Sequence, residues 1–361
     1  MSGLRAVVLE REDVELRAVL KKDPAPGAVL VDIPVPKPGP GEVLVKIKAT
    51  SICGTDHHIY VWNEWAQNRI KPPRIMGHEF AGEVVELGSG CLKAKVGDYV
   101  SAETHIVCGL CVQCMLGEKH VCQNTRILGV DTDGVFAEYA VVPEENLWYN
   151  DPSIPPHVAS VQEPLGNAVH TVMAGETRGK TFAVFGCGPI GLMSVAVAKA
   201  VGGTWVVACD INEYRLELAR AMGADLVINS LKDDPVQAIL DATKGVGVDV
   251  VLEMAGAAPV YQQMVKVVRP GGRIALLGLP SRPLTVNFSD DIVMRGVTLQ
   301  GITGRRMWDT WVMTRELLRS GKLNVEPIIT HHLDLADFAR GMDLMTEGNC
   351  GKVILYPEGL K

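Results

Sequence analysis

This sequence of 361 residues lacks long apolar runs and an excess of positive charge, and it contains few aromatic residues. Residues 195–201 form one of its apolar runs, which Lys199 interrupts, far short of the roughly 20 residues that span a membrane. The net charge of −7 excludes a polybasic face for binding nucleic acid. Aromatic residues make up only 5% of the chain beside 37 glycines, which favours an α/β protein over an aromatic-rich β-sandwich.

An export signal is also missing from the first residues. Charged side chains interrupt residues 1–10 at once, so we expect no signal peptide and a cytoplasmic protein with reduced cysteines. The nine cysteines are odd in number, which argues against a closed disulfide framework. Four of them are interpreted as small, buried apolar side chains: Cys91, Cys187, Cys209 and Cys350.

The turn residues divide the chain into parts of different character. Short strands separated by Gly and Pro, such as residues 42–49, fill the chain to about residue 160 and predict a barrel-like module. From Thr181 onward, apolar strands alternate with helices, which predicts a parallel sheet covered on both faces. The tail is too short to fold alone, so we expect it to return to the first module. The expected division is 1–164, 165–306 and 307–361.

A glycine-rich turn follows the first apolar strand of the alternating part. The pattern Gly186-x-Gly188-x-x-Gly191 ends a strand and opens a helix, which is the context of a dinucleotide-binding loop. Asp210 ends the next strand, where a carboxylate can bind the adenosine ribose hydroxyls and repel a 2′-phosphate. The sequence therefore predicts a site for NAD rather than NADP. A tight structural turn with a helix-capping Asp is the alternative.

Two groups of residues have the chemistry of metal ligands. Cys108, Cys111, Cys114 and Cys122 lie close together in sequence, and four thiolates fill the tetrahedral coordination of a structural zinc ion. An iron–sulfur cluster is the alternative, although no redox partner is evident. The second group is dispersed, and spacing alone leaves open whether its members share a metal: Cys53, His78, Glu79 and Glu163.

At these residues the chain resembles the zinc-dependent medium-chain alcohol dehydrogenases over essentially its whole length. The resemblance rests on Gly77-His78-Glu79, on the four-cysteine segment and on the glycine-rich turn. Within the family, the chain resembles the members that oxidise L-threonine, in stretches that include residues 53–60, 62–67 and 301–311. The resemblance implies a GroES-like β-rich catalytic domain, a doubly wound Rossmann NAD-binding domain and a homotetramer.

The resemblance also implies roles for individual residues. It implies two zinc ions per chain, one of them catalytic and held by Cys53, His78 and Glu79, while Glu163 is either a last ligand or a carboxylate beside the ligands. The remaining residues match a proton relay (Thr55 and His58), a position that recognises the amino-acid substrate (His105) and, beyond the three glycines, cofactor contacts (Ile190, Asp210, Arg215, Leu277, Gly278, Leu279, Ile302, Thr303 and Arg305).

The expected reaction is the oxidation of L-threonine by NAD to 2-amino-3-oxobutanoate, without nucleic-acid or membrane partners. Oxidation of a polyol such as sorbitol or 2,3-butanediol on the same scaffold is the alternative. A non-enzymatic NAD-binding protein would have lost ligand or relay residues, and all of them are present here. The acidic chain and the lack of a basic helix beside the cysteines argue against a zinc-finger DNA-binding protein.

The interpretation of Asp210 predicts the cofactor preference. In Asp210→Gly, the ribose loses its hydrogen-bond acceptor and a 2′-phosphate loses the repulsion, so NAD should bind more weakly and NADP should become usable. Titration of the purified wild type and the variant with both cofactors measures this. Equal use of NAD and NADP by the wild type would contradict the role given to Asp210.

Overall fold

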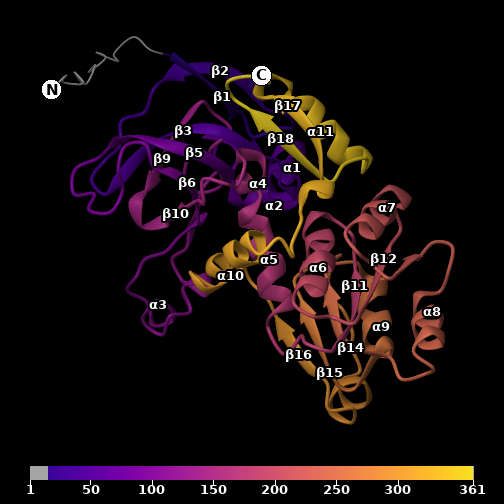
Figure 1. Ribbon diagram of the computed structural model, residues 1–361. Helices are drawn as coiled ribbons and strands as arrows, with labels where there is room; N and C mark the ends of the chain where they lie inside the picture. The colour runs from indigo at the N-terminus through magenta and orange to yellow at the C-terminus, as the bar shows by residue number, and fades with distance from the viewer. Residues whose placement is uncertain (1–14, 361) are drawn as a thin grey trace.

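The protein is described by a computed structural model that covers residues 15–360. The first ten residues, in which we expect no export signal, lie outside the described residues. Figure 1 shows a β-rich part and an α/β part side by side, with helices α5 (Gln162–Val172) and α10 (Asp309–Arg319) between them. Among residues 15–360, no helix combines the length and apolar character needed to cross a membrane.

The β-rich part is built on a seven-stranded sheet with the order β10-β6-β5-β3-β18-β17, in which β9 also pairs with β3. Its strands are β3 (Glu42–Ser51), β5 (Glu79–Leu87), β6 (Tyr99–Ala102), β9 (Tyr139–Pro143), β10 (Leu147–Tyr149), β17 (Ile329–Asp334) and β18 (Lys352–Tyr356). Two smaller sheets contain β1 (Glu15–Lys21), β2 (Val29–Pro34) and β4 (Arg74–Ile75), and β7 (His105–Ile106) and β8 (Arg126–Ile127). The helices of this part are α1 (Gly54–Val61), α2 (Glu64–Arg69), α3 (Val112–Met115) and α4 (Pro156–Ser160).

The end of the chain joins the sheet of the first part. β18 pairs with β3 in antiparallel fashion, with Ile354 opposite Ser51, and with β17 in parallel. Four consecutive β18 residues, 352–355, are buried, so both faces of this strand are covered. In Figure 1 the yellow strands β17 and β18 and helix α11 (Phe338–Glu347) accordingly lie beside the indigo strands of the N-terminal region.

The α/β part is a six-stranded parallel sheet with the order β13-β12-β11-β14-β15-β16. The strands are β11 (Thr181–Phe185), β12 (Trp205–Asp210), β13 (Leu226–Asn229), β14 (Val248–Glu253), β15 (Val268–Leu276) and β16 (Thr298–Gly301). The helices are α6 (Pro189–Ala200), α7 (Glu213–Ala221), α8 (Pro235–Ala242) and α9 (Ala258–Val267). A parallel sheet needs helical crossovers, and its continuous apolar strands are buried between them, as in β11. The predicted α/β class, with a β-rich and a doubly wound part, is confirmed.

Several strands were not expected from the sequence, among them β1 and β16. β1 carries Glu15 and Arg17, and β16 is largely exposed or half-buried, so neither has the apolar run that identifies a buried strand. The expected division near residue 164 falls inside helix α5, whose residues are almost all buried. That helix therefore packs as a connection between the two parts.

Gly77, next to His78, has a left-handed backbone conformation and packs closely against Phe136. Its φ is +87°, and a Cβ atom there would lie 2.1 Å from the Phe136 ring. Gly77→Ala should therefore lower the free energy of unfolding for two reasons. Overpacking typically costs about 1–3 kcal/mol, and the left-handed backbone costs about 1–2 kcal/mol more. Gly41→Ala, at φ +73° with nothing within 4 Å, bears only the backbone cost and is the control. Equal losses of unfolding free energy in denaturant titrations would contradict this prediction.

Candidate functional site

Asp56 brings the start of helix α1 against the loop before β5. Its Oδ2 accepts a hydrogen bond from the Cys53 backbone N–H at 2.9 Å, in a capping-box arrangement at the helix N-terminus. Its Oδ1 accepts from the Gly77 N–H at 3.2 Å and lies 3.6 Å from His78 Nδ1. A carboxylate at this nitrogen orients an imidazole whose Nε2 is a metal ligand. Asp56, which is fully buried, thus holds Cys53 and His78 together.

Cys53, His78 and Glu79 form a compact group of metal-ligating atoms. One ligand atom of each residue lies within 4.8 Å of the others. Glu79 is fully buried; its Oε2 is bound by Ser51 and Lys352, whereas its Oε1 has no hydrogen-bond partner among residues 15–360. A buried carboxylate oxygen without a partner is costly, and a cation beside it would remove that cost. The sulfur, nitrogen and oxygen donors fit zinc.

Glu163 does not belong to this compact group. Its Oε1 accepts a hydrogen bond from the Thr104 hydroxyl at 3.0 Å and lies 2.6 Å from Nη1 of Arg305. The residue is 7% exposed and lies in the first turn of helix α5. Of the four dispersed residues, the structure therefore brings three together and places the fourth beside an arginine.

Arg305 and Glu103 form a buried ion pair in the same region. Arg305 Nε donates to Glu103 Oε2 at 2.9 Å, and its Nη2 contacts Oε1. Trp311 Nε1 donates to the same Oε2 at 2.8 Å. Burial alone would raise the pKa of Glu103, but the Arg305 guanidinium outweighs it and holds that pKa at about 2. Arg305, expected to contact the cofactor, thus makes its hydrogen bonds to protein groups.

His105 lies on β7, and Thr55 and His58 lie on α1. His105 Nδ1 lies 3.5 Å from Glu103 Oε1, and the residue lines a small pocket of about 120 Å³ together with Lys93, Lys119, Asn146 and Trp308 among others. Burial and the Arg305 charge lower the pKa of His105, so its imidazole is neutral at pH 7. Thr55 and His58 lie three residues apart on α1, on one face of the helix.

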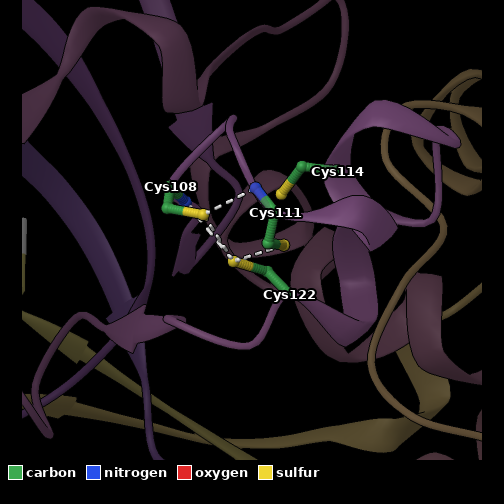
Figure 2. Close-up of side chains that lie close together, drawn as sticks. All are labelled: Cys108, Cys111, Cys114 and Cys122. Atoms are coloured by element: carbon green, nitrogen blue, oxygen red, sulfur yellow. Dashed lines mark hydrogen bonds between the residues drawn. The ribbon is translucent and has the colours of Figure 1, made fainter.

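The four remaining metal-ligating cysteines surround one point, as Figure 2 shows. The sulfur of Cys122 lies 3.5 Å from that of Cys108 and 3.8 Å from that of Cys111. Zinc–sulfur bonds of about 2.3 Å in a tetrahedron place two sulfurs about 3.8 Å apart, so the group fits a zinc ion. Backbone N–H groups, those of Leu110 and Cys111 first, lower the pKa of Cys108 to about 6, which favours the thiolate that zinc binds.

The glycine-rich turn lies between β11 and α6, at the carboxyl edge of the parallel sheet. Gly186 has φ +97°, and a Cβ atom on Gly191 would lie 1.9 Å from the Gly186 carbonyl oxygen, so both glycines are required for the turn. A Cβ on Gly188 would meet nothing within 4 Å, which leaves open space at the N-terminus of α6. A pyrophosphate fits such a cradle, because the helix N-terminus supplies unpaired N–H groups.

Asp210 ends β12 next to this turn. Its carboxylate accepts backbone N–H groups from Cys187 at 2.6 Å, Ile211 at 2.8 Å and Asn212 at 2.9 Å. On α7, Arg215 has a buried Nε without a hydrogen-bond partner in the described chain, so it can still bind a ligand. Other expected cofactor positions follow sheet strands at the same edge: Leu277, Gly278 and Leu279 after β15, and Ile302 and Thr303 after β16. Ile190 lies in the first turn of α6.

Three charged residues of the site were not expected from the sequence: Asp56, Glu103 and Lys352. Asp56 could have been found, because it occupies the third position after Cys53, where a carboxylate caps a helix. Lys352 binds Glu79 and donates a hydrogen bond of 2.8 Å to the Ile52 carbonyl. It lies on β18, 273 residues after Glu79 in the sequence. No local signal reveals such a contact.

Comparison with known proteins agrees with this arrangement. The model of the "Alcohol dehydrogenase GroES-like domain" matches residues 39–152, and that of the "Zinc-binding dehydrogenase" family matches residues 189–320. L-threonine 3-dehydrogenase of Symbiobacterium thermophilum is 54% identical over 344 residues, covering 95% of this chain and 98% of the relative. The chain belongs to the zinc-binding alcohol dehydrogenase family. The expected resemblance is thus confirmed.

Solved structures of this family are similar to the whole fold. A short chain alcohol dehydrogenase from Escherichia coli CFT073, complexed with NADH, has a TM-score of 0.86 at 31% identity. The 2R,3R-butanediol dehydrogenase of Bacillus subtilis has a TM-score of 0.85 at 29% identity. Both matches cover 95% of this chain and 99% of the other. The scaffold is therefore common to dehydrogenases that differ in substrate.

The four-cysteine group predicts the outcome of Cys111→Ser. Because a closed thiolate site contributes to folding, the variant should lose one zinc ion per chain and melt at a lower temperature, while any folded enzyme keeps its chemistry. Cys91→Ser is the matched control, since the Cys91 thiol donates to the Glu42 carbonyl at 3.2 Å outside both groups. Metal analysis and thermal melts decide; unchanged zinc content in Cys111→Ser would contradict the assignment.

Proposed function

We propose that this protein oxidises L-threonine to 2-amino-3-oxobutanoate, transferring a hydride from the substrate Cβ to NAD and releasing a proton. The observation that carries the proposal is the compact group of Cys53, His78 and Glu79. The negative charge of Glu79 is one of the causes that raise the pKa of Arg305. Arg305 follows β16 at the edge of the parallel sheet, so the group lies near the expected cofactor position. The 54% identity to an L-threonine 3-dehydrogenase supports the choice of substrate.

The catalytic zinc would be held by Cys53, His78 and Glu79, and the structural zinc by the four cysteines. When bound, the catalytic ion acts as a Lewis acid toward the substrate hydroxyl, which lowers the pKa of that hydroxyl. The Asp56 carboxylate lies 3.6 Å from His78 Nδ1, and Lys352 binds one oxygen of Glu79, so two of the three ligands have a charged neighbour in the chain itself. Glu163 is assigned a place beside the ligands, because its Oε1 is bound to Arg305.

Proton removal is assigned to helix α1. Thr55 accepts the proton of the substrate hydroxyl, and His58, one turn further and exposed, conveys it to solvent. Burial lowers the pKa of His58 below its ordinary value of 6.5. The imidazole is therefore neutral at pH 7 and can accept a proton.

Recognition of the amino-acid end of the substrate is assigned to His105 and Glu163. A zwitterion needs a donor for its carboxylate and an acceptor for its ammonium group. His105 would serve the carboxylate and Glu163 the ammonium, and the contacts of Glu103 and Arg305 support their placement side by side. Polyols present neither charge, so these residues favour an amino acid.

NAD would bind along the carboxyl edge of the parallel sheet. The N-terminus of α6 would take the pyrophosphate, and Asp210 and Arg215 would bind the adenosine ribose. The loops after β15 and β16, which contain residues 277–279 and 302–303, would contact the nicotinamide end. We further propose a cytoplasmic homotetramer with the domain division 1–164, 165–306 and 307–361; light scattering of the purified protein tests the tetramer.

Polyol oxidation is the second candidate, favoured by the similarity to the butanediol dehydrogenase fold. The deciding experiment measures NADH formation by the zinc-loaded protein with L-threonine, sorbitol and 2,3-butanediol. We expect the highest kcat/KM with L-threonine. A preference for either polyol would replace the proposed substrate while leaving the dehydrogenase chemistry in place.

The relay assignment predicts opposite metal contents for two variants. His58→Asn should keep both zinc ions and slow threonine oxidation by about 100- to 10,000-fold near neutral pH, with a smaller loss in alkali, where hydroxide can accept the proton. His78→Ala removes a proposed ligand, so it should lose the catalytic zinc and its activity but still bind NAD. Metal analysis, NAD titration and rates across pH check both. Loss of zinc from His58→Asn would contradict the relay role.

A further inference from the structure

Glu103 is a fully buried carboxylate that has no role in the proposed reaction. It directly follows β6 and meets groups from three other segments. Its Oε2 accepts from Arg305 Nε at 2.9 Å and from Trp311 Nε1 at 2.8 Å. Its Oε1 accepts the His105 backbone N–H at 3.0 Å and contacts Arg305 Nη2. Its carboxylate therefore contacts His105, one of the substrate-recognition groups, and Arg305, which pairs with the other, Glu163.

Glu103 fixes the His105 imidazole from one side. Its Oε1 lies 3.5 Å from His105 Nδ1, and it also anchors the backbone of the same residue. The ring also lies against Gly304, where an added Cβ would be 2.6 Å from His105 Cε1. The imidazole thus has a carboxylate and a glycine as close neighbours, which restricts its rotation.

Glu103 also fixes Glu163, through Arg305. A guanidinium has five N–H donors in a rigid plane, and Arg305 makes four hydrogen bonds with them. Two go to Glu103, one to Thr104 at 2.9 Å and one to Asn167 at 3.2 Å, and Nη1 also forms an ion pair with Glu163 at 2.6 Å. Because the plane is rigid, its attachment to Glu103 sets the direction in which Nη1 meets Glu163.

We propose that Glu103 is a positioning residue for substrate selection, which sets the places of both His105 and Glu163. It touches neither substrate nor cofactor. The inference rests on the proposed function, because those two groups are assigned to the carboxylate and the ammonium of an amino acid. Loss of the Glu103 charge therefore weakens the use of L-threonine more than the use of an alcohol without these charges.

Glu103→Gln tests this, since glutamine keeps the size and shape of the side chain and removes the charge. We expect kcat/KM for L-threonine to fall about 100-fold, mainly through KM, as displaced recognition groups cost about that much. The value for 2-butanol or 2,3-butanediol, whichever the wild type oxidises faster, should change little. If the wild type oxidises neither alcohol, the test is whether the KM for L-threonine rises while kcat changes little. Zinc content and NAD affinity should equal those of the wild type.

Two further variants keep the test decisive. Glu144→Gln is the matched control, because Glu144 also accepts several backbone N–H groups, those of residues 92–94, but has no hydrogen bond to His105 or Arg305 in the described chain. It should show no selective loss for L-threonine. The double variant E103Q/R305M removes both charges of this pair, so the Arg305 guanidinium is not left without its Glu103 partner if Glu103→Gln alone fails to fold, and Glu163 keeps the Thr104 hydroxyl as a hydrogen-bond donor. We expect the double variant to fold and to retain the selective loss.

Two results would overturn the positioning role. One is an unchanged KM for L-threonine in the folded Glu103→Gln or double variant. The other is an equal loss for all alcohols together with lower zinc content, which would show a purely structural residue. Failure of the proposed function is distinguishable, because it appears in the wild type as the absence of L-threonine oxidation before any variant is measured.

Discussion

The buried ion pair between Glu103 and Arg305 joins the two parts of the molecule. Glu103 follows a strand of the β-rich sheet, and Arg305 follows the last strand of the parallel sheet. Charges without contact to water are stable only when their hydrogen bonds are complete, and removing one partner of such a pair costs about 3–5 kcal/mol. The pair therefore fixes how the metal-ligating residues of one part face the nucleotide loop of the other. Trp311 adds α10 to the same joint.

Most of the α/β part was predictable from the sequence, because burial on both faces gives its strands continuous apolar runs. The strand Thr181–Phe185 was located at its observed bounds, and the glycine turn with its helix followed from it. β1 and β16 escaped prediction because their charged or exposed residues break the pattern that identifies buried strands. For these strands, tertiary pairing outweighs local preference.

The two metal-ligating groups differ in what the sequence could reveal. The four cysteines are local, so their spacing alone predicted their convergence, which the structure bears out. Cys53 and His78 meet through tertiary contacts that spacing cannot supply, and only the family resemblance predicted their meeting with Glu79. The supporting charges were missed because their signals are weak or distant: Glu103 resembles any carboxylate in a loop, and Lys352 comes from the last strand.

The place of Lys352 in the final strand has a consequence for biosynthesis. Until β18 leaves the ribosome, Glu79 lacks the cation that balances its charge, and β3 lacks the neighbour on that edge. The ligand-bearing residues can be translated early, but their pocket cannot close before residue 352 has emerged. The surroundings of the Cys53, His78 and Glu79 group are therefore completed only after the nucleotide-binding part has been made. A nascent chain arrested before residue 352 would carry the ligands without a finished site.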